Sequence, residues 1–399
     1  MFDPGSVRVR GPLRAHVEGL WAHLMRQGYA PLSSRNLLRV VADLGRWLKA
    51  EDLGLVDLSE DVVAAFLRHR RRTYTQFLTG RALEPLLTHL RAAGAIPKAR
   101  PVVDESPAGR LIREYATYLE HERGLVAVTI RAYTTFATRY VRDERPRLDW
   151  GRLTALEVTQ FVLRSASESS STGATKLVVS RLRSLLRFLH LRGVIDRDLA
   201  TCVPAVAGWR LAGLPKALEV SQIDRLVSSF DRSPIGLRDS AVVRLMLRLG
   251  LRAREVAALA LDDVDWQLGE ISVHGKGRHQ SRLPLPEDVG RELAAYLRRG
   301  RPRSALRSLF LRSRAPYAGM RSGAIIAAAG SALRRAGVLS GSAHLLRHTA
   351  ATQLLRRGAS LPEIAHVLRH RHIDTTAIYA KVDLASLGAL ARPWPGGVP

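Results

Sequence analysis

Residues 269–286 read "GEISVHGKGRHQSRLPLP", and this stretch decides the fold class of the chain. Short runs of alternating apolar and polar residues stand on both sides of a Gly-Lys-Gly turn. Such alternation around a glycine-containing turn predicts a β-hairpin. The sequence from residue 219 up to the hairpin, and again from residue 287 onward, has apolar residues at helical spacing. We therefore expect a mainly α C-terminal half with a small β-sheet, which is an α+β fold.

Two stretches nearer the N-terminus resemble each other. "HLMRQGYAPLSSRNLLRVVADLGRWL", from His23, aligns with "YLEHERGLVAVTIRAYTTFATRYVRD", from Tyr118, so that Gly28 matches Gly124. In each stretch a helical pattern ends near the glycine, and a Ser or Thr follows as a candidate N-cap of a second helix. Each copy then continues into an amphipathic helix. This repeat predicts two small helical domains, at 1–95 and 107–202, the first a duplicate of the second.

Two segments rich in Pro and Gly separate these domains from each other and from the rest. They are residues 92–109 and 203–218. The third domain is expected at 215–399, ending in "ARPWPGGVP", a tail too rich in Pro and Gly to form a helix. Leu387, Leu390 and Trp394 in this tail either pack on a neighbouring subunit or fold back on their own domain.

The charge of the chain points to a polyanionic partner. There are 62 Lys and Arg residues against 36 Asp and Glu, which is a formal net charge of +26. Nucleic acid is the commonest polyanion such a protein meets, although codon bias in a GC-rich genome also raises the arginine content. The single cysteine, Cys202, excludes a disulfide framework and Cys-based metal sites. No apolar run reaches membrane-spanning length, so we expect a cytoplasmic protein without a membrane partner.

Two basic residues, one before the predicted hairpin and one in its turn, are candidates for chemistry. Arg252 follows a Gly-Leu pair at a predicted helix junction, and Glu255 lies one turn later, where it can hold the guanidinium group. Lys276 lies between the two glycines of the hairpin turn and is one of only six lysines in the chain. A lysine there can deliver a proton, whereas arginine cannot because its pKa is too high. The alternative for both residues is ordinary surface charge.

A third candidate is the segment "SAHLLRHTAATQLLRRG", residues 342–358. Ser342 is placed to cap a helix that Gly358 ends. His344 and Arg347 are three residues apart and so share a face, which suits an anionic group that also needs proton transfer. His348 lies one position off that face and is expected to pack or to bind backbone.

The fourth candidate is "SLPEIAHVLRHRHIDTTAIYAKV", residues 360–382. Ser360 and Glu363 form the capping-box pattern of a short helix ending near His370. Asp374 is placed to cap a following helix that carries Tyr379 in its second turn. A break before Asp374 would bring His370 and Tyr379 together. Tyr379 is either a buried packing residue or a nucleophile.

Taken in this order, these residues resemble the tyrosine recombinases, the phage-integrase family. The catalytic domain of that family carries an arginine in G-L-R-x-x-E, a hairpin lysine, an H-x-x-R pair, a further His or Trp, and a nucleophilic tyrosine nine residues beyond. The residues that match here are Arg252, Lys276, His344, Arg347, His370 and Tyr379. The resemblance covers residues 215–385 closely and extends loosely to 107–200, which is similar to the family's helical core-binding (SAM-like) domain.

The resemblance implies a site-specific recombinase or integrase, of a mobile element, that cuts and rejoins double-stranded DNA through a 3′-phosphotyrosyl link. Arg252 and Arg347 would neutralise the scissile phosphate, and His370 would hydrogen-bond it. His344 would assist deprotonation of Tyr379, and Lys276 would protonate the leaving 5′-oxygen. No metal or cofactor is implied. Four subunits would join two recombination sites, with or without accessory DNA-bending proteins or a sister recombinase.

Two departures from the family pattern stand out. Arg369 occupies the position before His370 at which the family often has Gly, and it adds bulk and charge near the active centre. The first helical domain is not part of the minimal family architecture, and it either binds additional DNA or docks subunits.

Two other functions remain alternatives. A type IB topoisomerase-like relaxer would use the same covalent step, but as a monomer without a fixed sequence. A non-catalytic DNA-binding protein would keep the fold and lose the chemistry. The duplicated helical domain favours recombination over relaxation, and the complete residue set favours an enzyme over a binding protein.

Overall fold

The protein is described by a computed structural model, which covers residues 7–98, 104–169, 171–207, 216–275, 280–339, 341–370 and 376–382. It is mostly helical with one three-stranded antiparallel sheet, so the predicted α+β class is confirmed. The chain divides into two compact units, Met1–Lys98 together with Gly213–Pro399, and Ala99–Ala212. None of the helices in the described ranges is long and apolar enough to cross a membrane.

The first unit begins with a small helical bundle. Its elements are the 3-10 helix η2 (Gly11–His16), α1 (Val17–Arg26), α2 (Pro31–Ala50), α3 (Glu60–Arg70), the 3-10 helix η3 (Gly80–Ala82) and α4 (Glu84–Ala92). Their apolar stripes enclose a core that includes Leu24, Leu38, Leu44 and Phe66. Leucine and phenylalanine at helical spacing therefore account for this bundle.

The second unit is also a helical bundle. It contains α5 (Pro107–Thr117), the π-helical segment η4 (Tyr118–Glu122), α6 (Ala127–Glu144), the 3-10 helix η5 (Trp150–Arg152), α7 (Ala155–Glu168) and α8 (Thr172–Leu191). Its core is more aromatic, with Tyr115 and Phe188 fully buried and their ring centroids 5.1 Å apart.

The two bundles share the features that the sequence repeat predicts, with one exception. Gly28 and Gly124 both have left-handed backbone conformations directly after a helix, as a helix-ending glycine does. The predicted Ser or Thr caps of the next helices are wrong, because the N-cap residues are Ala30 for α2 and Val126 for α6. Pro31 begins α2 and has no N–H group that needs a cap.

The C-terminal part of the first unit contains the sheet. Its elements are α9 (Val220–Ser228), α10 (Pro234–Leu249), α11 (Ala253–Ala258), the 3-10 helix η6 (Leu261–Asp263), β1 (Val264–Asp265), β2 (Glu270–His274), β3 (Gln280–Pro284), α12 (Glu287–Ala295), the π-helical segment η7 (Tyr296–Gly300), α13 (Ser322–Arg335), α14 (Ala343–Arg356), α15 (Leu361–Val367) and the 3-10 helix η9 (Ala377–Val382). The strands pair in the order β1-β2-β3, with Ile271 opposite Leu283. The predicted hairpin is therefore confirmed.

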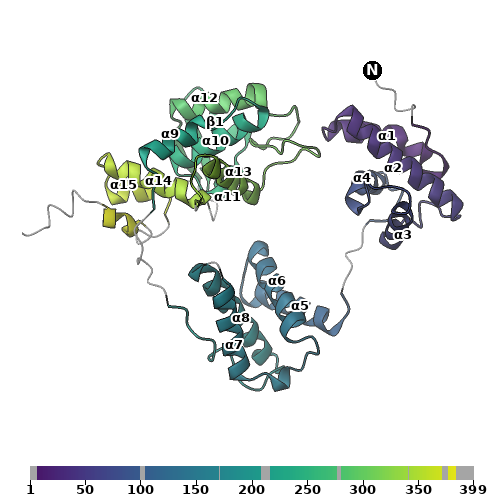
Figure 1. The fold of residues 1–399 in the computed structure, drawn as a ribbon, viewed down its shortest axis with the longest axis horizontal. Coiled ribbons are helices and arrows are strands. Elements are labelled where there is room, and N and C mark those ends of the chain that lie inside the picture. Colours follow the sequence, from purple (N-terminus) through teal and green to yellow (C-terminus); the bar gives the residue numbers. More distant parts are fainter. Residues whose placement is uncertain are drawn as a thin grey trace, which may run out of the picture. The chain divides into compact units, whose positions relative to one another are not determined.

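Helix α10 is the centre of this part of the molecule. It packs against α12, α13 and α14 (Figure 1) and is buried along most of its length. It ends at Gly250, which has a left-handed conformation. A Cβ atom at this position would lie 2.4 Å from Cδ2 of Leu368, so only glycine fits the turn. This turn places the next residues, Leu251 and Arg252, beside the ends of α14 and α15.

Candidate active site

Arg252 is held by its own helix, as the spacing predicts. It is the N-cap residue of α11, and its Nη1 donates to Oε1 of Glu255 at 2.7 Å. The backbone N–H of Arg252 donates to Oε2 of the same carboxylate at 2.9 Å. Glu255 is completely buried, while the side chain of Arg252 keeps 26% of its surface exposed. The carboxylate thus fixes the arginine and leaves part of its guanidinium group accessible.

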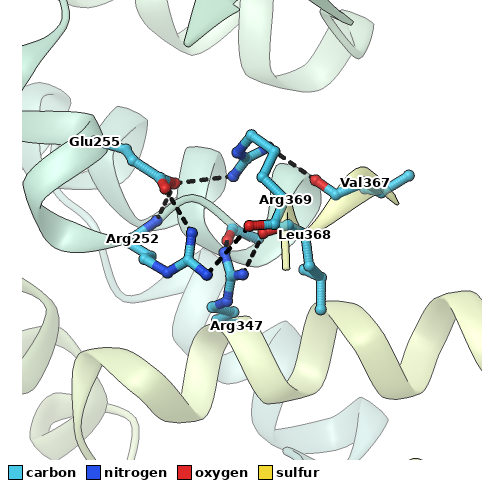
Figure 2. Close-up of polar contacts among 7 residues, drawn as sticks. Arg252, Glu255, Arg347, Val367, Leu368 and Arg369 are labelled. Atoms are coloured by element: carbon cyan, nitrogen blue, oxygen red, sulfur yellow. Dashed lines mark hydrogen bonds and ion pairs between the residues drawn. The ribbon is translucent and has the colours of Figure 1, made fainter. Parts of the chain in front are cut away.

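Arg347 lies on α14 and is buried. Its Nη1 donates to the backbone carbonyl of Gly250, and its Nη2 donates to that of Leu368 (Figure 2). Burial, followed by the charge of Arg252, lowers the pKa of Arg347 to about 9, which leaves the group cationic at neutral pH. One guanidinium group therefore joins the end of α10 to the segment after α15.

Arg369 reaches the same carboxylate from the other side. Its Nη2 donates to Oε2 of Glu255 at 2.9 Å, and its Nη1 donates to the carbonyl of Val367 at 2.8 Å (Figure 2). Burial tends to raise the pKa of Glu255, but the charges of Arg369 and Arg252 outweigh it and hold that pKa below its usual value. Glu255 is therefore an anion shared by two arginines.

Tyr379 is buried beside this arginine cluster. It lies in the first turn of η9, earlier in its helix than expected, and packs with Ala351, Ile364 and Leu368. The predicted cap at Asp374 lies outside the described residues. Desolvation raises the pKa of Tyr379 to about 12, and Arg347 partly opposes that rise. The phenol is thus neutral at rest and needs a proton acceptor to attack.

His348 provides a hydrogen-bond partner for this phenol. Its Nδ1 lies 2.8 Å from the hydroxyl oxygen of Tyr379. Burial lowers the pKa of His348, so the ring is neutral at pH 7 and able to accept the hydroxyl hydrogen. The sequence interpretation of His348 as a packing residue is partly right, because its ring lies against that of Tyr379, but it missed the hydrogen bond to the phenol. Its position one turn after His344 on the same helix was the signal that could have identified it.

The two predicted histidines differ in their surroundings. His344 is exposed on α14, and burial together with Arg347 and Arg252 lowers its pKa. Nδ1 of His370 is hydrogen-bonded to Oγ1 of Thr376 at 2.6 Å. Burial and then Arg347, Arg252 and Arg369 lower the pKa of His370 to about 4, so it is neutral near the arginine cluster. Neutral histidines beside arginines can hydrogen-bond a phosphate without adding charge.

The structure therefore brings together most of the predicted site residues. Arg252, Arg347, His370 and Tyr379 are linked by hydrogen bonds or electrostatic interactions, with Glu255, His348 and Arg369 among them. Lys276 lies outside the described residues. In the described ranges, no group of three or more His, Cys, Asp or Glu side chains is arranged to hold a metal ion. Guanidinium groups, neutral imidazoles and a buried phenol suit phosphoryl transfer to tyrosine.

Comparisons with known proteins agree with this chemistry. The phage integrase family matches residues 216–385. The putative integrase/recombinase y4rA of Sinorhizobium fredii (strain NBRC 101917 / NGR234) is 39% identical over 97% of this chain and 95% of its own length. The tyrosine recombinase XerD of Mycobacterium tuberculosis (strain ATCC 25618 / H37Rv) is 31% identical over 72% of this chain and 97% of its own length.

A solved structure shares the fold. The lambda integrase tetramer bound to a Holliday junction superposes with a TM-score of 0.53 at 17% identity, over 74% of this chain and 85% of that chain. At such low identity the likeness concerns the fold alone. The relatives are matched over nearly their whole lengths, so this chain belongs to the phage integrase family of tyrosine recombinases, a family of site-specific recombinases.

Proposed function

We propose that this tyrosine recombinase breaks and rejoins DNA with Tyr379 as its nucleophile. The observation that carries the proposal is the buried Tyr379 hydroxyl, 2.8 Å from a neutral His348 and beside the arginine cluster of Arg252 and Arg347. A buried phenol needs a hydrogen-bond partner even when it only packs, so the cationic Arg347 beside it is what favours a nucleophile over a packing residue.

Arg252 and Arg347 are proposed to bind the two non-bridging oxygens of the scissile phosphate. Each guanidinium group has five N–H donors, so the contacts that hold it in place leave donors for the ligand. Charge on those oxygens grows as the phosphorus is attacked, so the interaction is strongest in the transition state. Losing one such donor typically costs about 10²–10³-fold in rate. His370, neutral and held by Thr376, adds a hydrogen bond to the same phosphate.

Deprotonation of Tyr379 is the difficult step, because its pKa is raised to about 12. His348 orients the hydroxyl before DNA binds, through the hydrogen bond to Nδ1. His344, one turn earlier on α14 and exposed, is available to take the proton when the substrate is present. A positioned general base of this kind contributes roughly 10²–10⁴-fold.

The transfer balances without any added reactant. A bond forms between the Tyr379 oxygen and phosphorus, and the bond from phosphorus to the 5′-oxygen breaks. Lys276 is proposed to protonate that oxygen, while the phenol proton goes to histidine. The 3′-phosphotyrosyl ester keeps the energy of the phosphodiester, so the 5′-hydroxyl of another strand can reverse the step.

The assembly is proposed from the same reasoning. The subunits would bind double-stranded DNA, and four of them would join two recombination sites. The integrase names of relatives and the tetrameric lambda integrase complex support this arrangement and a role in a mobile element. A DNA substrate in the cell also supports the expected cytoplasmic location.

The test uses nicked duplexes made from the genomic DNA that flanks the gene. Wild-type protein and Tyr379→Phe are incubated with them without metal, and denaturing gels are used to detect a protein–DNA adduct. We expect an adduct with the wild type only. Adducts of equal strength with Tyr379→Phe would reject this nucleophile. Relaxation of any supercoiled plasmid by the monomer would instead assign a topoisomerase-like activity.

A further inference from the structure

Arg369 has a backbone conformation that an arginine rarely adopts. Its φ is 54°, in the left-handed region that suits glycine. For an L-residue this conformation is strained. Its Nε–H is also buried without an acceptor among the described residues, and a buried unpaired donor is a further cost in stability. Glycine would incur neither cost, so the arginine must gain from the contacts that its side chain makes.

The contacts of Arg369 show where the side chain acts. Only 9% of its surface is exposed, and its head group meets Glu255, whose side chain is completely buried (Figure 2). The same carboxylate oxygen, Oε2, accepts from the backbone N–H of Arg252. The side chain therefore points at the residue that orients Arg252, and it is largely shielded from solvent.

The balance of charge explains what this contact changes. If Glu255 paired with Arg252 alone, the two charges would cancel and the carboxylate would compete with a phosphate for the arginine. With Arg369 present, two guanidinium groups share one carboxylate, so positive charge stays in excess where a phosphate would bind. Burial of Glu255 makes both effects stronger than they would be in water.

We propose that Arg369 is a positioning residue for Arg252. Its ion pair fixes the carboxylate of Glu255 and thereby orients the guanidinium group of Arg252. It also offsets the negative charge of Glu255, which would otherwise hold Arg252 away from the DNA phosphate. The inference rests on the proposed function, because it assigns Arg252 to the scissile phosphate. Arg369 itself is not assigned a contact with DNA.

The main test compares Arg369→Gly and Arg369→Lys with the wild type on the nicked duplexes. Arg369→Gly should lower the single-turnover cleavage rate by about 10–100-fold, since a small misplacement of a catalytic group costs on that order. DNA affinity should stay within about twofold of the wild type, because a buried side chain forms no contact with the DNA backbone. The thermal midpoint should fall, since a buried ion pair with Glu255 is lost, although relief of the left-handed strain offsets part of that fall. Arg369→Lys keeps the charge and should recover part of the rate.

Two further experiments distinguish this positioning role from an independent effect of Arg369 and from a general effect of charge. In the Glu255→Gln background, adding Arg369→Gly should lower the single-turnover cleavage rate by less than about threefold. The effects of two residues that act through one another are not additive. Arg357→Gly is a matched control, since Arg357 is exposed at the end of α14 and its replacement removes the same charge. It should leave the cleavage rate within about twofold if remote charge contributes little across solvent.

The outcomes that overturn the inference are specific. Cleavage by Arg369→Gly at the wild-type rate rejects it. So does a fall in affinity as large as the fall in rate, which would mean direct DNA contact, or full additivity with Glu255→Gln. Arg252→Ala and Tyr379→Phe are measured in parallel. If both are inactive while Arg369→Gly is normal, only this inference fails. If Tyr379→Phe still forms adducts, the proposed function fails and this inference with it.

Discussion

Several carboxylates among the described residues each pair with two arginines, and two of these clusters are alike in that pairing but differ in their surroundings. In the candidate active site, Glu255 holds Arg252 and Arg369. In the N-terminal bundle, Asp43 on α2 holds Arg46 and Arg70. In each cluster one arginine is nearly buried and the other reaches solvent.

The two clusters differ in what surrounds the carboxylate. Glu255 is completely buried, and a buried tyrosine with a histidine partner lies nearby. Asp43 is 15% exposed, at the edge of an open cavity of about 570 Å³. The other residues lining that cavity include Arg8, Arg35, Arg39, Tyr74 and Phe77. Charge alone therefore does not distinguish the candidate active site from the N-terminal cluster, whereas burial and the adjacent tyrosine do.

The largest expected effect tests the nucleophile. Tyr379→Phe should abolish adduct formation while DNA affinity is retained, because it removes one oxygen and no positive charge. Tyr74→Phe is the matched change in the other cluster, where the Tyr74 ring lies 4.0 Å from the Arg70 guanidinium. It should leave adduct formation unchanged on the same gels. Equal reduction in both variants would remove the distinction between the clusters.

The next effect tests the buried arginines. Arg347→Lys should lower the single-turnover cleavage rate by about 10²–10³-fold, because lysine cannot form the paired hydrogen bonds of a guanidinium group. It should also lower the free energy of unfolding by about 1–3 kcal/mol, since the carbonyls of Gly250 and Leu368 lose their donors. Arg70→Lys in the other cluster should change the single-turnover cleavage rate by less than about threefold, because that cluster is not part of the candidate active site. Chemical denaturation and cleavage assays measure both.

A smaller effect concerns pH. His370 has a folded-state pKa of about 4, below its ordinary value of 6.5. The unfolded state therefore binds more protons between these two values, and stability decreases as pH falls through this window. The thermal midpoint should decrease as the pH is lowered from 6.5 to 4, and His370→Gln should make that decrease smaller. The remainder of the decrease should come from the other histidines whose pKa values are lowered, which are His23, His89, His344 and His348. An identical pH profile in wild type and variant would contradict the buried neutral state of His370.

The smallest effect tests the N-terminal cavity as a DNA-backbone binding surface. Replacing Arg35, Arg39 and Arg46 with Ala should weaken DNA binding. The slope of the logarithm of the binding constant against the logarithm of salt concentration should also become shallower, by up to about 0.9 for each phosphate that is no longer neutralised. The cleavage rate at saturating DNA should not change. A control triple variant at the exposed Arg291, Arg298 and Arg299 removes the same charge elsewhere. Equal weakening in both triples would mean that the cavity has no special role.

Features set by short sequence spacing were predictable. The Ser360–Glu363 capping box and the left-handed Gly358 after α14 are both found where the sequence places them. The Arg252–Glu255 pair is three residues apart, within one turn, so helix geometry alone brings the side chains together. Helical start signals were less reliable, because Pro31 begins α2 without a side-chain cap.

Contacts between residues far apart in the chain were not predictable. His348 and Tyr379 are 31 positions apart, and Glu255 and Arg369 are 114 apart. Neither spacing has a periodicity that a sequence pattern can express. Arg369 was recognised as unusual from the sequence, but its partner was not.

The sequence by itself determined the fold class and the order of the chemistry-bearing residues, because these depend on local periodicity and residue type. Only the tertiary structure decided which of those residues meet. The left-handed turn at Gly250 ends α10, and the guanidinium group of Arg347 joins that end to the backbone at Leu368 through two hydrogen bonds. That junction places Arg369 on Glu255, and the packing of Tyr379 against Leu368 and Ile364 places its hydroxyl at His348. Burial then gives each of these contacts the strength that the same residues would lack in water.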